Sequence, residues 1–327
     1  MFLRPTSETP MYSMFSLWVR SHADLPLKTF QIVNTFRYET KQTRSFIRVR
    51  EIHFFEAHTV HADQNGADSQ IEEDAEMVRR ILRELCLPSI VCKRPVWDTF
   101  PGAWYTKAAD VVMPNGRTLQ VATYHHYRDQ WAEAFDLTYE DSEGNTKSCH
   151  QTTFGMSERL LGAVVGMHGD DNGLIMPPSV APFQVIVMPI AAHTDPNVTI
   201  AVEELSERLT NRGLRVEIDF RDVRPGVKHF DWEIKGAPLR VELGPRDLAS
   251  GKCIVSLRTG GKVEISLDDA PNKIFELLDS VSDELRLRAE KLVSELVKPF
   301  PLERISDAES FEDEIEDGIV YELPFSG

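Results

Sequence analysis

Two stretches in the first fifth of the chain alternate apolar and polar residues with a period of two. They cover residues 27–38 and 46–61, and the polar segment 39–45 separates them. This alternation is typical of half-buried strands, and a short polar segment between two such strands indicates an antiparallel hairpin. We therefore predict one long hairpin, with Arg48 and Arg50 on the same face of its second strand.

Helical periodicity flanks this hairpin on both sides. Before it, four apolar residues recur at the spacing of one helix face: Met11, Met14, Phe15 and Trp18. The side chain of Ser7 or Thr9 offers an oxygen that can cap the free N–H groups of this helix. After the hairpin, residues 66–87 carry an apolar stripe at the same spacing, and Pro88 is expected to end that second helix.

The pattern of predicted strands and helices changes near residue 183. From residue 91 to that point, short strands alternate with Gly and Pro turns, and one helix begins near Met156. Beyond it, apolar strands and amphipathic helices alternate, at residues 184–188, 198–211, 214–220, 238–243, 253–257 and 274–297. We predict an α+β chain: an antiparallel sheet with flanking helices, followed by an α/β domain.

Composition supports folded domains and limits the kinds of partner. The chain has 327 residues, of which 42% are hydrophobic, so it can form real cores. Its net charge is −16, which argues against a general nucleic-acid surface. Residues 301–327 are strongly acidic, whereas residues 37–50 hold five bases and one acid. A basic cluster inside an acidic protein favours a small polyanion such as a nucleoside triphosphate.

Cysteine usage predicts a reducing compartment. The four cysteines are scattered without a C-x-x-C pair, so we expect neither a disulfide framework nor a thiolate zinc site. The sequence contains no apolar run of ~18 residues, the length that a membrane-spanning helix needs. A cytoplasmic location is expected.

The basic cluster contains a pattern suited to anion binding. Arg37 and Glu39 are two residues apart, so on a strand they point to the same side of the sheet. The planar fork of arginine can clamp a phosphate or a carboxylate, and a glutamate can accept a hydrogen bond from an adenine amino group. On this pattern alone, a solvated hairpin with surface ion pairs remains an open alternative.

A second candidate lies at the predicted helix near Met156. Gly155 allows a ligand to approach the backbone closely, and Arg159 falls in the first turn of the helix. The helix dipole opposes a cation there, so an arginine so placed often binds an anion such as phosphate. An ordinary capped core helix is the alternative.

Together, the two patterns resemble motifs 2 and 3 of class II aminoacyl-tRNA synthetases, and more specifically the prolyl-tRNA synthetase family of the archaeal and eukaryotic type. The resemblance rests on short segments in the expected order, at residues 4–9, 34–39, 56–59, 116–120, 123–125, 168–174, 177–182, 224–228 and 232–240. It runs nearly end to end. It implies an ATP-dependent proline–tRNA ligase.

The resemblance also implies roles for individual residues. Proline would be bound by Thr6, Glu8, Arg37 and His125. ATP would be bound by Arg37, Glu39, Arg48, Val49, Gln120, Thr123 and Arg159. Arg37 and Arg159 would be the catalytic pair. Mg²⁺ would accompany ATP near Gln120 and Thr123, and no protein-held metal site is expected.

The family pattern implies a domain plan and a set of partners. Residues 1–182 would be a partial class II catalytic core, residues 183–285 an anticodon-binding domain, and residues 286–327 a C-terminal helix with an acidic tail. The expected partners are tRNA(Pro), proline and a second copy of the chain. Motif 1, which builds the family's dimer interface, is not recognisable, Ser326 stands where a first zinc cysteine is usual, and no editing domain is expected.

Several residues depart from the family pattern around the expected amino-acid pocket. Trp104 and Tyr124 replace smaller or acidic residues, and residues 127–131 are also changed. We expect these changes to crowd that pocket rather than the ATP site. Two alternatives to a proline–tRNA ligase therefore stay open: a paralogue that binds tRNA or another partner without catalysis, and a relative that activates a different amino acid.

Overall fold

The computed structural model describes residues 3–40, 42–299 and 316–322, and the chain divides into two compact units. The first unit consists mainly of Met1–Leu82 and Ser89–Ala163, and the second mainly of Arg83–Pro88 and Val164–Glu303. Most of the acidic tail and Ser326 lie outside the described residues.

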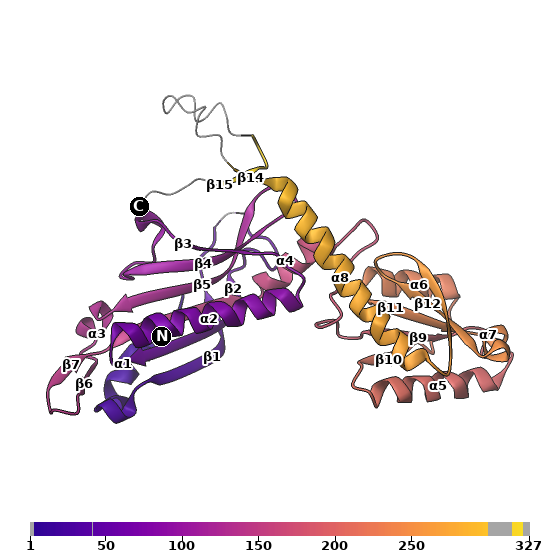
Figure 1. The fold of residues 1–327 in the computed structure, drawn as a ribbon, viewed down its shortest axis with the longest axis horizontal. Helices are drawn as coiled ribbons and strands as arrows, with labels where there is room; N and C mark the ends of the chain where they lie inside the picture. Colours follow the sequence, from indigo (N-terminus) through magenta and orange to yellow (C-terminus); the bar gives the residue numbers. More distant parts are fainter. Residues whose placement is uncertain (1–2, 41, 300–315, 323–327) are drawn as a thin grey trace. The chain divides into compact units, whose positions relative to one another are not determined.

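A six-stranded sheet forms the first unit, and all its neighbouring strands are antiparallel (Figure 1). Its strands, in spatial order, are β1 (Leu27–Phe36), β2 (Glu51–His61), β8 (His150–Ser157), β5 (Thr118–Arg128), β4 (Tyr105–Val112) and β3 (Ile90–Lys93). A separate small pair is formed by β6 (Thr138–Glu140) and β7 (Thr146–Ser148). The predicted antiparallel sheet is confirmed.

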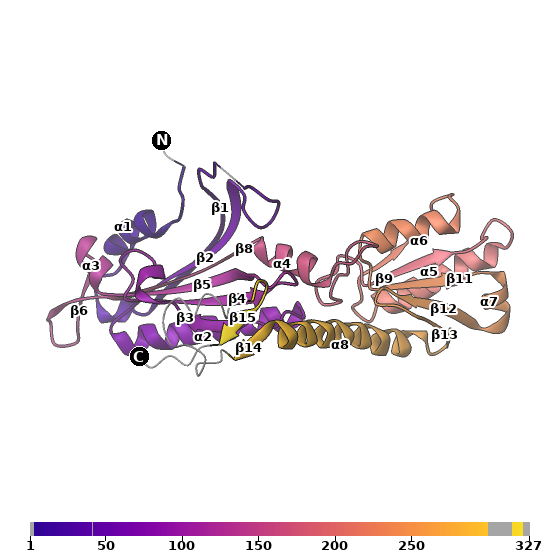
Figure 2. The ribbon, with the colours of Figure 1, turned by 90° about the horizontal axis from the view of Figure 1, so that it is seen from above.

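Helices flank this sheet, and the long helix α2 runs along it (Figure 2). The helices of the first unit are α1 (Glu8–Trp18), α2 (Gln64–Glu84) and α3 (Gln130–Ala134), with 3-10 turns at His22–Asp24 and Val96–Asp98. The helix α4 (Arg159–His168) follows β8 directly. The strand therefore continues past Met156, where we expected the helix to begin.

The buried face of α1 differs from the predicted one. Tyr12 and Phe15 are fully buried, whereas Met14 and Trp18 are 43% and 51% exposed. Tyr12 can enter the interior because its hydroxyl shares a 2.8 Å hydrogen bond with Thr153 on β8. The predicted cap is also wrong, since the side chain of Ser7 makes no capping bond and Thr9 lies inside the helix.

The predicted hairpin exists, but its second strand begins later than expected. β1 pairs with β2 along its whole length, from Leu27 opposite Val60 to Phe36 opposite Glu51. Arg48 therefore lies in the loop between the strands and not on β2. The reason is a tight turn: the Arg48 N–H donates to the carbonyl of Arg44 (2.9 Å), and Phe46 takes a positive φ of 62°.

A mixed five-stranded sheet forms the second unit. Its spatial order is β10 (Val216–Ile218), β9 (Val185–Pro189), β11 (Leu239–Leu243), β12 (Lys252–Leu257) and β13 (Lys262–Ser266). The first three strands are parallel, and β12 and β13 continue the sheet antiparallel. Parallel strands need crossover connections, which matches the predicted α/β character.

Helices and apolar side chains complete this second core. The helices are α5 (Pro196–Thr210), α6 (Pro225–Ile234), α7 (Pro245–Ser250) and α8 (Ala270–Leu296). Of these, α6 and α7 were not expected from periodicity. Val187, Val202, Val241 and Ile274 are among its fully buried residues. Two further short strands are Val297–Pro299 and Val320–Glu322. Among the described helices, none has the length and apolarity needed to cross a bilayer.

A buried carboxyl on α2 gives the first unit a pH-dependent stability. Asp74 is 6% exposed and accepts one hydrogen bond from Gln70 (2.9 Å), while its Oδ2 has no partner among the described residues. Burial, with a smaller contribution from Glu73, raises the pKa of Asp74 to about 6. The folded state thus holds this proton more tightly than the unfolded state, so stability is lost as pH rises through about 6.

We expect Asp74→Asn to stabilise the protein at pH 8 and to have little effect at pH 4. Removing the buried charge should raise the free energy of unfolding at pH 8 by up to about 3 kcal/mol, because one pKa unit corresponds to about 1.4 kcal/mol. Urea unfolding at both pH values measures this. Glu84→Gln, an exposed change on the same helix, is the control. Equal stability of wild type and Asp74→Asn at pH 8 would contradict the prediction.

Candidate active site

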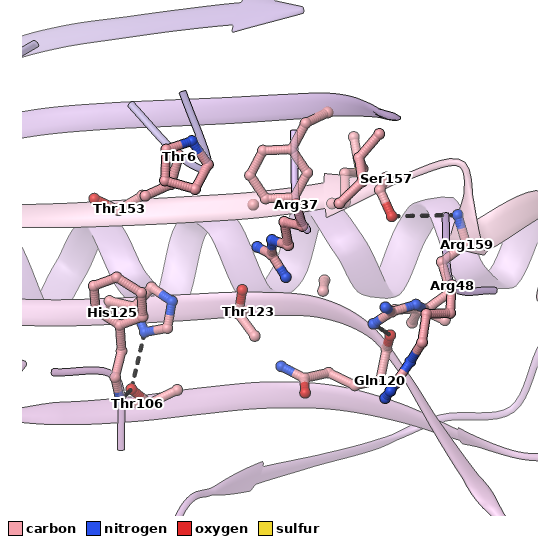
Figure 3. A pocket seen from close by; sticks show the side chains of 18 of the residues that line it. Thr6, Arg37, Arg48, Thr106, Gln120, Thr123, His125, Thr153, Ser157 and Arg159 are labelled. Carbon is pink, nitrogen blue, oxygen red and sulfur yellow. Dashed lines mark hydrogen bonds between the residues drawn. The ribbon is translucent and has the colours of Figure 1, made fainter. Parts of the chain in front are cut away.

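The first unit contains a cavity of about 630 Å³ (Figure 3). Its wall brings together ten residues that the sequence analysis selected, from five separate segments: Thr6, Glu8, Arg37, Glu39, Arg48, Val49, Gln120, Thr123, His125 and Arg159. The structure therefore brings all of these candidates to one place. Their individual roles stay predictions.

Arg37 lies in the middle of this cavity. It directly follows β1, and its backbone N–H donates to the carbonyl of Arg50 (2.9 Å), which extends the hairpin by one pair. Figure 3 shows its side chain between two groups: Thr6 and His125 on one side, and Arg48, Gln120 and Arg159 on the other. The cavity thus has two chemically different ends that Arg37 connects.

One end is rich in arginine. The Arg159 side chain donates to the carbonyl of Ile47 through Nε (3.0 Å) and to the carbonyl of Gln120 through Nη1 (3.0 Å). Burial lowers the pKa of Arg159, and the charges of Arg37 and Arg48 lower it further. Three cations held this close together favour an anion with several charges.

The hairpin loop contributes the outer part of this end. Arg48 Nη1 lies 3.9 Å from Glu39 Oε2, and Arg50 Nε donates to the Glu39 carbonyl (2.8 Å). More than half of the Arg48 side chain is exposed, and Glu39 is less exposed. The weak ion pair leaves both side chains free to exchange partners when a ligand arrives.

The opposite end holds two buried carboxyl groups. Glu8 and Glu56 are 2% and 0% exposed. The hydroxyl of Thr6 is hydrogen-bonded to Glu8 Oε2 and lies 3.1 Å from Glu56 Oε1. Behind them, Gln31 Nε2 donates to Glu56 Oε2 (2.8 Å), and His58 Nε2 lies 3.7 Å from the same oxygen. Negative charge at this end suits a cationic amine.

Glu56 and His58 were not selected from the sequence, although they lie in one of the segments that carried the resemblance. Burial acts to raise the pKa of Glu56, but its polar neighbours, foremost the nearby His58 ring and also the hydrogen bond from Gln31, hold it below its ordinary value. Two polar residues alternating with apolar ones on a buried strand were the available signal. Periodicity alone could not show that Glu56 would meet Thr6, which is 50 residues away.

His125 on β5 borders the same end as a neutral group. Its Nδ1 is 2.9 Å from Thr106 Oγ1, and the ring of Phe100 lies over it at a centroid distance of 4.6 Å. Burial lowers the pKa of His125 to about 4. At neutral pH the imidazole is therefore uncharged and offers shape and one hydrogen-bonding nitrogen.

The expected crowding of this end is wrong for two residues. Tyr124 does not line the cavity, since it alternates with His125 and stacks on Phe154 at a centroid distance of 5.4 Å. Trp104 also lies outside the lining and packs under Arg128, whose guanidinium is 3.4 Å from the ring centroid. Tyr127 does reach the site indirectly, because its hydroxyl donates to Glu8 Oε1 (3.3 Å).

The second unit has a smaller cavity of about 370 Å³. It is lined by charged and small residues: Asp170, Asn172, Glu233, Arg240, Ser256, Leu257, Arg258, Thr259, Gly260, Gly261 and Lys262. Arg258 forms a bidentate pair with Asp170, so its charge is largely compensated. Arg240 is less well paired, because its Nη1 lies 3.9 Å from Glu233 Oε2, too far for a hydrogen bond. The Nε and Nη1 atoms of Arg240 are buried without a hydrogen-bond partner among the described residues. Unpaired buried N–H groups favour a polar ligand here.

Two families match this chain, one after the other along the sequence. Residues 1–168 match the family described as "tRNA synthetase class II core domain (G, H, P, S and T)". Residues 184–277 match the family described as "Anticodon binding domain". The larger cavity lies within the first match, and most of the residues around the smaller cavity lie within the second.

Individual relatives agree with these matches. The chain is 49% identical over 331 residues to a proline--tRNA ligase of Thermococcus kodakarensis, covering 100% of this chain and 68% of that protein. It is 53% identical over 291 residues to a proline--tRNA ligase of Methanoregula boonei, covering 88% of this chain and 60% of that protein.

A solved structure is also similar. Giardia lamblia prolyl-tRNA synthetase in complex with prolyl-adenylate matches with a TM-score of 0.88 and 40% identity. This match covers 91% of the present chain and 64% of that one. The chain thus spans about two-thirds of the length of these relatives.

Proposed function

The chain belongs to the proline--tRNA ligase family of class II tRNA synthetases, and from this premise we propose that it activates proline with ATP and transfers it to tRNA(Pro). One observation carries the proposal. In a single cavity, a carboxyl group lies on one side of Arg37 and two further arginines lie on the other, which supports an amine site next to a phosphate site. Adenylation needs both substrates joined at one point, which is where Arg37 lies.

The first step joins the proline carboxylate to the α-phosphorus of ATP and releases pyrophosphate. The carboxylate is itself the nucleophile, so no side chain has to remove a proton. Arg37 bridges the carboxylate and the α-phosphate, and its fork holds the two reacting groups in line. Arg48 and Arg159 stabilise the charge that develops on the leaving phosphates.

The other predicted residues orient the two substrates. Thr6 and Glu8 accept hydrogen bonds from the amine of proline, and His125 borders its ring. Glu39 reads the adenine amino group, Val49 meets the nucleotide through its backbone, and Gln120 and Thr123 line the ATP side. The position of each residue along the cavity, near the carboxyl group or near the arginines, supports these roles.

Mg²⁺ bound with ATP fits the arginine-rich end. Glu158 lines the cavity, and its Oε2 is buried with no hydrogen-bond partner among the described residues. Mg²⁺ is commonly held by one or two carboxylates together with substrate phosphates. In the described part of the chain, no three His, Cys, Asp or Glu side chains form a metal cage, so most ligands would come from ATP. Glu158 and Gln120 would hold the ion, which would neutralise phosphate charge.

We propose residues 1–182 as the catalytic core, residues 183–285 as the anticodon-binding domain and residues 286–327 as a C-terminal segment. A homodimer and a cytoplasmic location complete the proposal. The smaller cavity would take nucleotides of the tRNA anticodon, since the unpaired N–H groups of Arg240 and the exposed ammonium of Lys262 can donate to base edges and phosphates.

Amino-acid-dependent exchange of pyrophosphate into ATP tests the central proposal. We expect exchange with proline and subsequent charging of tRNA(Pro) with proline. Exchange with another amino acid in place of proline would show that the chain activates a different acid. No exchange with any amino acid, together with retained tRNA binding, would instead support a non-catalytic paralogue.

The smaller cavity gives an independent prediction for tRNA. Arg240→Ala should raise KM for tRNA(Pro) in the charging reaction about ten- to hundredfold, the usual effect of losing one base-reading arginine. Lys252→Ala, which removes an exposed charge on β12 away from the cavity, is the matched control. Pyrophosphate exchange, which needs no tRNA, checks that the first unit is intact. An unaltered KM for tRNA would show that the smaller cavity does not bind the anticodon.

A further inference from the structure

The amine end of the larger cavity contains one hydroxyl between two carboxyl groups. Thr6 Oγ1 is hydrogen-bonded to Glu8 Oε2 and is 3.1 Å from Glu56 Oε1. A hydroxyl has one hydrogen to donate and two lone pairs that accept. Thr6 can therefore donate to only one of the two carboxylates at a time, and the other must be satisfied in some other way.

The remaining oxygens of both carboxylates are already fixed. Glu56 Oε2 accepts from Gln31 (2.8 Å), and Glu8 Oε1 accepts from Tyr127 (3.3 Å). The two oxygens that face Thr6 differ in position. Glu8 lines the cavity, whereas Glu56 does not and is completely buried behind Thr6. Of Thr6, Glu8 and Glu56, only Thr6 and Glu8 can therefore touch a ligand.

A bound secondary ammonium allows both carboxylates to be satisfied at the same time. One of its N–H groups can donate to Glu8 Oε2, and the other can donate to a lone pair of Thr6 Oγ1. The hydrogen of Thr6 must then point away from the ligand, toward Glu56 Oε1. Without a carboxylate behind it, that hydrogen would stay on Glu8 and compete with the ammonium for the same oxygen.

We propose that Glu56 is a positioning residue of the amine site, which turns the Thr6 hydroxyl so that it accepts from the substrate rather than donating to Glu8. Gln31 fixes the carboxylate of Glu56 from behind. The inference rests on the proposed function, because it takes the ligand of this end to be the amine of proline. In this proposal Glu56 acts only by orienting the Thr6 hydroxyl and does not contact the substrate.

The variant Glu56→Gln tests this orientation directly, since it keeps shape and removes charge. Its carbonyl oxygen would face the Gln31 amide, so its NH₂ group would face Thr6 and donate to it. The Thr6 hydrogen would then remain on Glu8. We expect KM for proline to rise about ten- to hundredfold, the range for losing a hydrogen bond to a charged group, with kcat changed less than about threefold. Glu51→Gln, an exposed change on the same strand, is the matched control.

A second variant separates positioning from a general structural effect. In a Thr6→Val background the hydroxyl is gone, so Glu56→Gln should have no further effect on KM for proline. Thr6→Ser, which keeps a hydroxyl, should retain the sensitivity to Glu56→Gln. Equal losses in all backgrounds would overturn the inference.

The outcomes also separate this inference from the proposed function. If the wild type exchanges pyrophosphate with proline but Glu56→Gln leaves KM for proline unaltered, the inference alone is wrong. If the wild type shows no exchange with proline, the proposed function fails and the inference fails with it. A KM effect that disappears without the Thr6 hydroxyl supports both.

Discussion

Replacing Arg37 with alanine is expected to slow proline-dependent pyrophosphate exchange by about a hundred- to thousandfold, the loss that follows removal of one preorganised donor. Arg37 lies between the amine end and the arginine-rich end of the cavity, so it meets both substrates at the atoms that react. Steady-state exchange at saturating ATP and proline measures the effect as kcat. Most of the loss should appear there, since the contact is strongest as the bond to phosphorus forms.

Lysine at position 37 should not restore the activity. A single ammonium group carries the charge but cannot fork across a carboxylate and a phosphate. Arg44→Ala is the matched control, because Arg44 lies in the same loop but outside the cavity lining. We expect it to have a mild effect that falls mainly on tRNA. Full activity of Arg37→Lys would show that charge alone suffices and would contradict the proposed bridging role.

Replacing Arg159 with alanine is expected to have the second largest effect, at least about a hundredfold in kcat/KM for ATP. Arg159 has two tasks, because it also ties the carbonyl of Ile47 in the hairpin loop to that of Gln120 on β5. Its loss should therefore remove a phosphate contact and loosen the loop that carries Arg48. Exchange measured over a range of ATP concentrations should show a raised KM as well as a lowered kcat.

Lysine at position 159 separates the two tasks of Arg159. It keeps a positive charge near the phosphates, but it cannot make both backbone contacts in the same plane. We expect an activity between those of wild type and Arg159→Ala. Arg117→Ala serves as control, because Arg117 is exposed, directly precedes β5 and does not line the cavity. If Arg159→Lys and wild type had equal KM for ATP, the backbone contacts would have no part in nucleotide binding.

The period-two pattern predicted the hairpin well but not its end. Phe46 and Arg48 continue the alternation, so the sequence favours a strand through them. In the structure the turn at Arg44 closes first, and Phe46 and Ile47 lie against Gly162 of α4, where a Cβ would come within 2.7 Å of Ile47. A contact with a residue more than 100 positions away decides this local geometry, and no local pattern contains it.

The candidate site followed the same rule. The residues that the motifs selected line one cavity, some at the ends of strands and helices and others, such as Thr123 and His125, inside β5. Glu56 was missed because its importance comes from the approach of Thr6. The role expected for Tyr124 was wrong because its neighbours on β5 alternate between the two faces of the sheet, and Tyr124 lies on the face away from the cavity.

The three arginines at one end of the cavity have a consequence for the empty protein. Arg37, Arg48 and Arg159 repel one another, and Glu39 and Glu158 offset only part of this repulsion. The folded chain therefore gives up stability at this place so that it is ready for a polyanion. The nucleotide is a substrate and also stabilises the folded state, since it binds the native protein and relieves the repulsion. Binding of ATP therefore turns mutual repulsion among these arginines into attraction toward a shared anion.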